Sequence, residues 1–249
     1  MEAERIRIAV DAMGGDFAPQ NVIAGALDAL RESNNRFDVL FIGVEKIVNE
    51  QLRITRHNRL AYRVVDAPEV VEMHDTAIAV LREKKNSSIS VGMTLHKEGK
   101  VDAFVSAGHS GAMMSASTLI LGRIENVGRP TIGAFLPSER GVCLLLDAGA
   151  NVDCKPQHLY EFAVMGSIYA SQMFNIQRPS IGLLSIGEES SKGNEVVKEA
   201  HKLLVQSKLN FIGNVEGRDI LKGKADVVVC DGFVGNIILK FGESVPSFF

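Results

Sequence analysis

The sequence predicts an α/β fold built on a mostly parallel β-sheet. Short runs of apolar and β-branched residues recur along the 249 residues, and amphipathic segments with helical spacing lie between many of them. Several of the short runs end in loops rich in Gly, Asp, Ser and Asn. Strands that alternate with helices are typical of a parallel sheet covered by helices.

The strands are expected where an apolar run is short and bounded by turn residues. In chain order they are Ile6–Asp11, Val39–Gly43, Ala61–Asp66, Ala103–Ser106, Thr131–Phe135, Val142–Asp147, Ile181–Ser185, Phe211–Asn214 and Asp226–Cys230. Helices are expected where apolar residues recur at helical spacing, namely in Asn21–Arg31, Thr76–Lys84, Ser110–Leu121, His158–Met173 and Glu195–Gln206.

The chain is expected to form one domain over residues 1–249, because no long linker, repeat or low-complexity stretch divides it. Its last segment, Gly235–Phe249, begins like a helix and stops without a capping signal or a polar tail. We therefore expect this domain to lack its C-terminal portion.

Composition excludes some partners and compartments. A net charge of −3 supplies no overall basic field for nucleic acid or an anionic bilayer. Cys143, Cys154 and Cys230 are widely spaced and odd in number, which favours a reducing compartment. The charged start of the chain lacks the apolar run of a signal peptide, so a cytoplasmic location is expected.

The loops after the strands are the candidate functional site. They are Asp11–Asp16, Ser106–Gly111, Asp147–Asn151, Ser185–Asn194 and Asp231–Asn236. The carboxyl ends of parallel strands share one sheet edge, so these loops would line a single crevice. Glycine lets the backbone approach a ligand, and N–H groups at helix starts favour an anion such as phosphate. For any single loop, a tight turn is the simpler interpretation.

Cofactor and metal signatures are absent from the sequence, so we expect neither a cofactor nor a metal. There is no P-loop, no strand-linked dinucleotide fingerprint and no H-E-x-x-H. Asp11 and Asp16 bracket two glycines, but two carboxylates without further ligands are weak support for a metal site.

A serine hydrolase is one alternative. Ser110 stands at a strand–turn–helix bend similar to a nucleophile elbow, although Ala112 departs from G-x-S-x-G. The histidines that follow Asp147 are His158 and His201, and both stand where solvated or packed histidines are common.

Three other polar residues have both a functional and a structural interpretation. Lys192 precedes a predicted helix and could reach an anion, although loop lysines are usually surface charges. Asp231 and Asn236 flank Gly-Phe-Val-Gly, where Asp and Asn often serve only as caps and turn residues.

The combination of loop motifs resembles the PlsX family of phosphate acyltransferases. The opening Ile8-Ala-Val-Asp-Ala-Met-Gly-Gly-Asp-Phe-Ala-Pro19 is similar to the start of that family, and Ser-Ala-Gly-His-Ser-Gly-Ala, Leu-Asp-Ala-Gly-Ala-Asn and Asp-Gly-Phe-Val-Gly-Asn follow in the family's order. The resemblance covers essentially the whole chain.

The resemblance implies a three-layer α/β/α fold similar to isopropylmalate dehydrogenase and phosphate acetyltransferase. It implies a homodimer, peripheral contact with the membrane, and a longer protein that continues beyond Phe249. The implied reaction moves a long-chain acyl group from acyl carrier protein (ACP) to inorganic phosphate for phospholipid synthesis. A short-chain phosphotransacylase using coenzyme A and a non-catalytic scaffold remain as further alternatives.

The hypothesis for the site assigns roles in this acyl transfer to residues of the candidate loops. Lys192 and Asn236 would stabilise phosphate or the developing oxyanion, and Asp231 would orient one of them. The phosphate-binding set would comprise Asp11, Gly14, Gly15, Asp16, Gly108, His109, Ser110, Gly111 and Asn194. Many relatives carry Asn at the position of His109, so the resemblance gives that side chain no role of its own.

Two further guesses concern the donor substrate. The segment around Met113, Met114, Leu119 and Ile120 is a candidate wall for the acyl chain, although core packing is the simpler interpretation. A basic patch that docks the acidic ACP would include Arg123 and Arg129.

Overall fold

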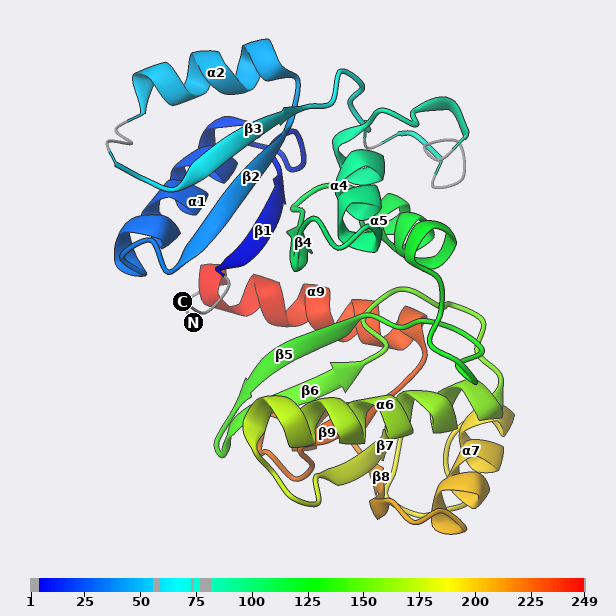
Figure 1. The fold of residues 1–249 in the computed structure, drawn as a ribbon. Helices are drawn as coiled ribbons and strands as arrows, with labels where there is room; N and C mark the ends of the chain where they lie inside the picture. The colour runs from blue at the N-terminus through cyan, green and yellow to red at the C-terminus, as the bar shows by residue number, and fades with distance from the viewer. Residues whose placement is uncertain (1–4, 56–58, 73, 77–81, 249) are drawn as a thin grey trace. The chain divides into compact units, whose positions relative to one another are not determined.

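The computed structural model describes residues 5–55, 59–72, 74–76 and 82–248, and its contacts divide the chain into two compact units. Unit 1 is Met1–Arg123 and unit 2 is Ile124–Phe249. Figure 1 shows that each unit has its own β-sheet. The sequence offers no signal for this division, because no linker composition marks the residues around Arg123.

Unit 1 is a parallel sheet with helices on both faces. Its strands lie in the order β3-β2-β1-β4. The elements are β1 (Ile6–Asp11), α1 (Gln20–Glu32), β2 (Phe37–Gly43), α2 (Glu45–Ile54), β3 (Tyr62–Asp66), α4 (Ser88–Lys97), β4 (Ala103–Val105), α5 (Ser110–Ala116) and the π-helical turn η1 (Ser117–Leu121).

Successive side chains of β2 point to opposite faces of the sheet, and this alternation explains the layers of unit 1. Val39 and Phe41 point to the face covered by α1 and α2, where Leu27 of α1 packs with them. Leu40 and Ile42 point to the opposite face and join the cluster that α4 covers. Because successive side chains of a strand point to opposite faces, a continuous apolar run requires cover on both sides.

Unit 2 has the same three-layer construction around a sheet in the order β5-β6-β9-β7-β8. The β5–β6 pair is antiparallel and the other pairs are parallel. The elements are β5 (Gly133–Ser138), β6 (Gly141–Leu146), α6 (Pro156–Phe174), β7 (Ser180–Leu184), α7 (Glu195–Val205), β8 (Asn210–Val215), α8 (Gly217–Leu221), β9 (Val227–Val229) and α9 (Gly232–Phe248).

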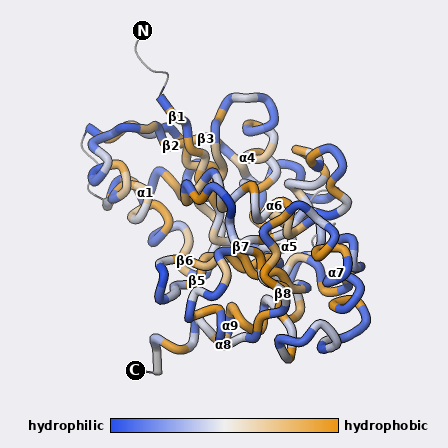
Figure 2. The backbone as a smooth tube through the Cα atoms, turned by 90° about the horizontal axis from the view of Figure 1, so that it is seen from below, coloured by the Kyte–Doolittle hydropathy of each residue, from blue (hydrophilic) through white to orange (hydrophobic). Residues whose placement is uncertain are grey.

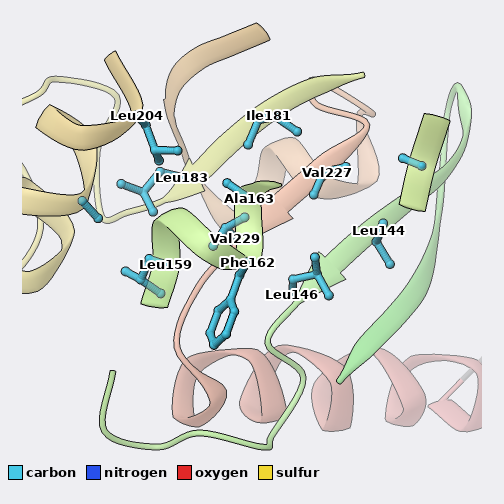
Figure 3. Close-up of a cluster of buried hydrophobic side chains, with 12 residues drawn as sticks. Leu144, Leu146, Leu159, Phe162, Ala163, Ile181, Leu183, Leu204, Val227 and Val229 are labelled. Carbon is cyan, nitrogen blue, oxygen red and sulfur yellow. The ribbon is translucent and has the colours of Figure 1, made fainter. Parts of the chain in front are cut away.

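The larger core of unit 2 lies between the sheet and helices α6 and α7. Phe162 of α6 and Leu204 of α7 are buried there with Leu144, Ile181 and Val227 of the strands (Figure 3). On the other face, α8 and α9 cover a second buried cluster. The hydropathy trace is orange at β7, as expected for a strand covered on both sides (Figure 2).

Most of the predicted elements are confirmed. Every predicted strand is present, with ends that differ by a few residues, and the α/β class is confirmed. Helix α6 begins at Pro156, and the helix predicted over Ser110–Leu121 is divided into α5 and η1. Helices α2, α4 and α8 were not predicted. The helix predicted over Thr76–Lys84 falls largely on residues 77–81, which lie outside the described residues.

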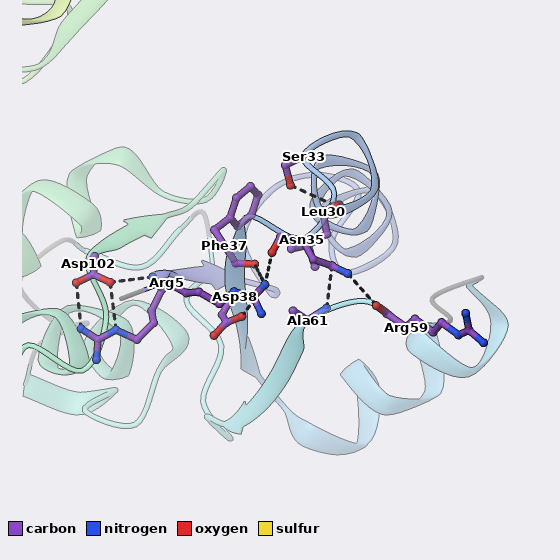
Figure 4. Close-up of polar contacts among 10 residues, drawn as sticks. Arg5, Leu30, Ser33, Asn35, Phe37, Asp38, Arg59, Ala61 and Asp102 are labelled. Atoms are coloured by element: carbon purple, nitrogen blue, oxygen red, sulfur yellow. Dashed lines mark hydrogen bonds and ion pairs between the residues drawn. The ribbon is translucent and has the colours of Figure 1, made fainter. Parts of the chain in front are cut away.

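The amino ends of the unit 1 strands are joined by polar contacts. Asp102 accepts two hydrogen bonds from the Arg7 guanidinium, at 3.0 and 3.1 Å, and these bonds hold the pKa of its carboxyl below the usual value. Asn35 accepts from the Ala61 N–H at 3.1 Å and donates to the Arg59 carbonyl at 2.9 Å (Figure 4). These contacts lie at the edge of the sheet opposite the glycine-rich loops.

None of the helices in the described ranges has the length and apolar character needed to cross a bilayer.

Candidate functional site

In unit 1, the loops after β1 and β4 meet because these strands are neighbours in the sheet. Ser106 donates a hydrogen bond from its Oγ to Asp11 Oδ2 at 2.7 Å, and the N–H of Gly108 donates to Ser106 Oγ at 3.0 Å. The other oxygen of Asp11 accepts from the N–H of Met13 at 3.1 Å. The buried Asp11 carboxylate therefore joins the two loops, and its predicted contact with phosphate stays a prediction.

The two unit 1 loops touch backbone to backbone. A Cβ at Gly14 would overlap Asp11 Oδ2 and would lie 2.9 Å from the Gly108 nitrogen. Gly15 has φ +108°, a conformation that side chains disfavour. The motif Asp-Ala-Met-Gly-Gly-Asp therefore has a structural reason for both glycines. Asp16 and Ser110 are exposed beside this contact.

His109 caps helix α5. Its Nδ1 accepts a hydrogen bond from the Ala112 N–H at 3.2 Å, so the ring proton of the neutral side chain is on Nε2. Asparagine also caps helices well, so Asn at this position would fill the same capping role. Ser110 and Gly111 follow as the first residues of α5.

In unit 2, Asp147 organises the loop that follows β6. Its buried carboxylate accepts from the N–H groups of Ala150 and Asn151, both at 2.8 Å, and from Asn151 Nδ2 at 2.7 Å. It also accepts from the N–H of Gly149 at 3.2 Å. Because both oxygens of the Asp147 carboxylate accept hydrogen bonds from its own loop, its role is to hold the shape of that loop.

The first turn of α9 packs on the Asp147 loop, because β6 and β9 are neighbours in the sheet. Asn236 is exposed, and its side chain lies beside Gly149. Asp231 accepts a hydrogen bond from the Val234 N–H at 2.9 Å and so caps α9. In the described part of the chain, no hydrogen bond or ion pair links Asp231 to Lys192 or Asn236, and the orienting role stays a prediction.

The loop after β7 presents Lys192. Buried Asn214 donates to the Glu189 carbonyl at 2.9 Å and fixes one side of this loop. Asn194 accepts from the Val197 N–H at 2.9 Å and caps α7. Lys192 is exposed, and within the described residues its ammonium forms no ion pair or hydrogen bond. Its positive charge is therefore free to meet an anion.

The neighbouring acidic residues do not neutralise Lys192 by direct contact. Glu188 is paired instead with Lys224, with 2.6 Å between Oε1 and Nζ. Glu189 lies beside Gly187, as does the aliphatic stem of Lys192. Among the residues that the structure describes, Lys192 is thus unpaired, whereas Lys224 pairs with the adjacent carboxylate of Glu188.

The five predicted loops do not share one sheet edge, so that expectation is wrong. The strands form two sheets, and each unit gathers its own loops at the carboxyl edge of its own sheet. Unit 1 brings together Gly14, Gly15, Gly108, His109, Ser110 and Gly111 with Asp11 and Asp16, whereas unit 2 carries Lys192, Asn194, Asp231 and Asn236.

Sequence reasoning placed Ser106, Asp147 and Asn151 in the candidate loops but missed that their side chains hold the loops in place, and it did not single out Asn214. Their signal in the sequence is a polar residue at or beside the end of an apolar strand, where burial forces it to bond to the backbone. The candidate acyl wall is only partly core: Met113 and Ile120 pack on the buried Ile89 and Met93, whereas Leu119 is 67% exposed.

The two histidines of the hydrolase alternative, His158 and His201, make their contacts within unit 2. His158 Nδ1 accepts from the Lys155 N–H at 3.1 Å, and burial lowers the pKa of this ring. His201 Nδ1 lies 3.0 Å from Asn214 Oδ1, and its ring packs edge-on against Phe211. Both rings are thus engaged in the framework of unit 2.

The thiols are poor nucleophiles, and we expect them to react slowly in the native chain. Burial raises the pKa of Cys143 to about 12 and that of Cys154 to about 11, and it raises the pKa of Cys230 further. The thiolate is the reactive form, and its fraction at pH 8 is correspondingly small. A disulfide reagent should label all three thiols rapidly only in denaturant, and rapid labelling of Cys154 in the native chain would contradict this prediction.

No cluster of three or more metal-ligating side chains occurs in the part of the chain that the structure describes.

Comparison with known proteins identifies the family. A family model described as "Fatty acid synthesis protein" matches residues 6–249. A phosphate acyltransferase from Thermodesulfovibrio yellowstonii is 52% identical over 242 residues, which make up 97% of this chain and 69% of that protein. A phosphate acyltransferase from Chlorobaculum parvum is 51% identical over 248 residues, 98% of this chain and 73% of that one.

Solved structures share the fold. The EutD phosphotransacetylase from Staphylococcus aureus has a TM-score of 0.67 at 22% identity and covers 98% of this chain and 83% of its own. A branched-chain phosphotransacylase from Enterococcus faecalis has a TM-score of 0.59 at 17% identity, with 94% and 83% covered. At these identities the likeness concerns the fold, and it confirms the predicted phosphate acetyltransferase-like architecture. By its family model and its identity to these relatives, the chain belongs to the fatty acid synthesis protein family, the PlsX phosphate acyltransferases that its loop motifs predicted.

Proposed function

We propose that the chain transfers a long-chain acyl group from acyl-ACP to inorganic phosphate and so supplies acyl phosphate for phospholipid synthesis. The observation that carries the proposal is 52% identity across 97% of the chain to a phosphate acyltransferase. The structure adds support from the ammonium of Lys192, which is unpaired in the described part of the chain, and from glycine-rich loops at the carboxyl edges of both sheets.

The reaction needs positioning and charge stabilisation, without an enzyme nucleophile. A phosphate oxygen attacks the thioester carbonyl, negative charge develops on the carbonyl oxygen, and the C–S bond breaks to release the ACP thiol. Placing the two reactants in line lowers the barrier, and one well-aimed oxyanion donor contributes about 3 kcal/mol. The raised thiol pKa values agree with a direct transfer, because no cysteine is poised to carry the acyl group.

Lys192 is assigned the phosphate charge or the developing oxyanion, since its ammonium is exposed and unpaired among the described residues. Asn236 is assigned a hydrogen bond from its side-chain amide to the same charged centre. The Asp147 loop supports Asn236 through the contact with Gly149. Asn194 acts by capping α7, which fixes the end of the Lys192 loop.

The unit 1 loops are assigned to binding of phosphate oxygens. The close contact between Gly14 and Gly108 holds two loop backbones together, and Ser110 is exposed at the start of α5 beside them. Ser106 and Asp11 would keep this arrangement rigid through their 2.7 Å hydrogen bond. Each assignment is open to test with a single variant.

The proposal extends to partners and location. The acyl donor would be ACP, the chain would act in the cytoplasm with peripheral contact to the membrane, and it would form a homodimer. ACP is acidic, so docking would use exposed cations such as Arg123. Arg129 is the other candidate cation, and its guanidinium donates to the Asp153 carbonyl at 2.8 Å.

The test measures acyl phosphate, trapped as a hydroxamate, together with free ACP thiol from long-chain acyl-ACP, with and without inorganic phosphate. Phosphate-dependent release of both in equal amounts is expected. Thiol release without phosphate or hydroxamate, lost in Ser110→Ala, would instead identify a serine hydrolase. Activity with acetyl-CoA alone would identify a short-chain phosphotransacylase, and a folded chain without turnover on any donor would leave a scaffold.

A further inference from the structure

Two residues outside the proposed site, Asn214 and His201, form hydrogen bonds next to the Lys192 loop (Ser185–Asn194). Asn214 lies near the end of β8 and is only 3% exposed, and His201 lies in the middle of α7. A buried polar group without a partner is costly, so the two polar atoms of the Asn214 amide must both be bonded. The partners of this amide therefore show what it holds.

The carbonyl of Glu189 fixes the orientation of the Asn214 amide. A carbonyl oxygen only accepts, so the amide atom 2.9 Å from it is the donor Nδ2. The other amide atom, Oδ1, lies 3.0 Å from Nδ1 of His201 and has to accept from it. His201 therefore carries a proton on Nδ1, in its neutral as in its charged form, and donates it to Asn214.

The Glu189 carbonyl connects this pair with Lys192 itself. The oxygen that accepts from Asn214 also accepts from the backbone N–H of Lys192, at 3.0 Å. Three hydrogen bonds thus link His201 to the backbone of Lys192. The Lys192 ammonium is exposed and has no partner of its own among the described residues, so its place depends on the backbone that carries it.

Helix α7 anchors the Lys192 loop at two points. The first is the cap, in which Asn194 accepts from the Val197 N–H at 2.9 Å directly after the Lys192 turn. The second is His201, about two turns further along the helix, which reaches the loop through Asn214. A loop held at two points of one rigid helix keeps fewer conformations than a loop held only at its end, and rigid support is what precise positioning requires.

We propose that His201 and Asn214 are positioning residues for acyl transfer, which set the place of the Lys192 ammonium through the Glu189 carbonyl. The inference rests on the proposed function, because the position of this ammonium affects turnover only if Lys192 meets the phosphate or the oxyanion. A displacement of about 1 Å in a reacting group costs up to about a hundredfold in rate, so a remote hydrogen bond of this kind has a measurable effect.

Two variants of His201 separate its hydrogen bond from the packing of its ring. His201→Phe keeps an aromatic ring against Phe211, which the native ring meets edge-on at 5.1 Å, but removes the donor. His201→Asn removes the ring and keeps an N–H donor as many bonds from the backbone as Nδ1. In the hydroxamate assay we expect kcat/KM to fall about 10- to 100-fold in His201→Phe and to recover most of this loss in His201→Asn.

Hydrogen exchange of the native full chain measures the loop independently of turnover. Amides of residues 186–194 should exchange at least about tenfold faster in His201→Phe, and close to the wild-type rate in His201→Asn. Residues 227–229 of the buried strand β9 should exchange as in the wild type. His96→Phe is the matched control, because His96 lies on α4 of unit 1 and has no hydrogen bond or ion pair from its side chain among the described residues. It should change neither exchange nor turnover.

Unchanged exchange of residues 186–194 in His201→Phe would overturn the proposal, and so would equally fast exchange of residues 227–229, which would mean a general loss of stability. A loss of turnover in His201→Asn as large as in His201→Phe would assign the effect to ring packing and overturn it too. In a Lys192→Ala background His201→Phe should cost no further turnover, because positioning acts only through the lysine. Normal turnover of Lys192→Ala beside faster loop exchange in His201→Phe would instead support the tie to the loop and overturn the assignment of Lys192.

Discussion

Lys192→Ala is expected to lower the turnover of phosphate-dependent acyl transfer by about 10²–10³-fold, the usual effect of removing one donor to a developing oxyanion. The ammonium is exposed and, within the described residues, unpaired, so its removal leaves no buried partner without a contact. Stability should therefore be nearly unchanged. The measurement is kcat and KM for phosphate in the hydroxamate assay, beside an unfolding curve for each protein.

Lys208→Ala is the matched control for Lys192. Lys208 is also exposed in unit 2 and has no ion pair in the described ranges, but it lies before β8, at the sheet edge opposite the candidate loops. We expect wild-type turnover for this variant. Near-normal turnover of a folded Lys192→Ala would remove the central assignment, and an equal loss in Lys208→Ala would point to a general effect of surface charge.

Gly235→Ala is expected to lower the free energy of unfolding by about 3 kcal/mol, at the upper end of overpacking effects. The added Cβ would overlap the carbonyl oxygen of Asp147 and would lie 3.0 Å from Cys230 Sγ. The overlapped atom is backbone, so α9 or the Asp147 loop must move. Because small displacements of positioning groups are costly, acyl transfer should also fall by about a hundredfold. Urea unfolding and the hydroxamate assay measure the two effects.

Gly25→Ala is expected to stabilise the fold, in contrast to Gly235→Ala. Gly25 lies exposed within α1, and a Cβ there would meet no atom within 4 Å. Alanine should therefore raise the free energy of unfolding by about 0.5–1 kcal/mol, because it restricts the unfolded chain and favours the helix. If both variants changed stability equally, crowding at Gly235 would not be the cause, and the packing of α9 on the Asp147 loop would need revision.

Local patterns in the sequence were enough to predict the strands, the α/β class and the loops that end the strands. Ile6–Asp11 and Val39–Gly43 are recognisable because an apolar run between turn residues is a local property, set by neighbours in the chain. The motifs in the loops also identified the family, since the order of motifs is a property of the sequence alone. Helix α4 was not predicted because Ser88, Ser90 and Gly92 interrupt its apolar pattern. These residues have low helix propensity, but they are buried in the fold, and tertiary packing overrides the propensity.

The pairing of the strands, and the polar side chains whose hydrogen bonds hold the loops in place, became visible only in the folded chain. Strand pairing depends on contacts between distant segments, so the division into two sheets was not readable from local pattern. Asp147 looks like Asp231 in sequence, yet the first is buried among N–H donors and the second caps a helix near the surface. Likewise, the apolar pattern of α6 predicts a helix, but only the fold shows that Ile168 remains exposed after the core is filled. The burial of a side chain depends on how the layers pack on one another, so it cannot be read from the order of residues along the chain.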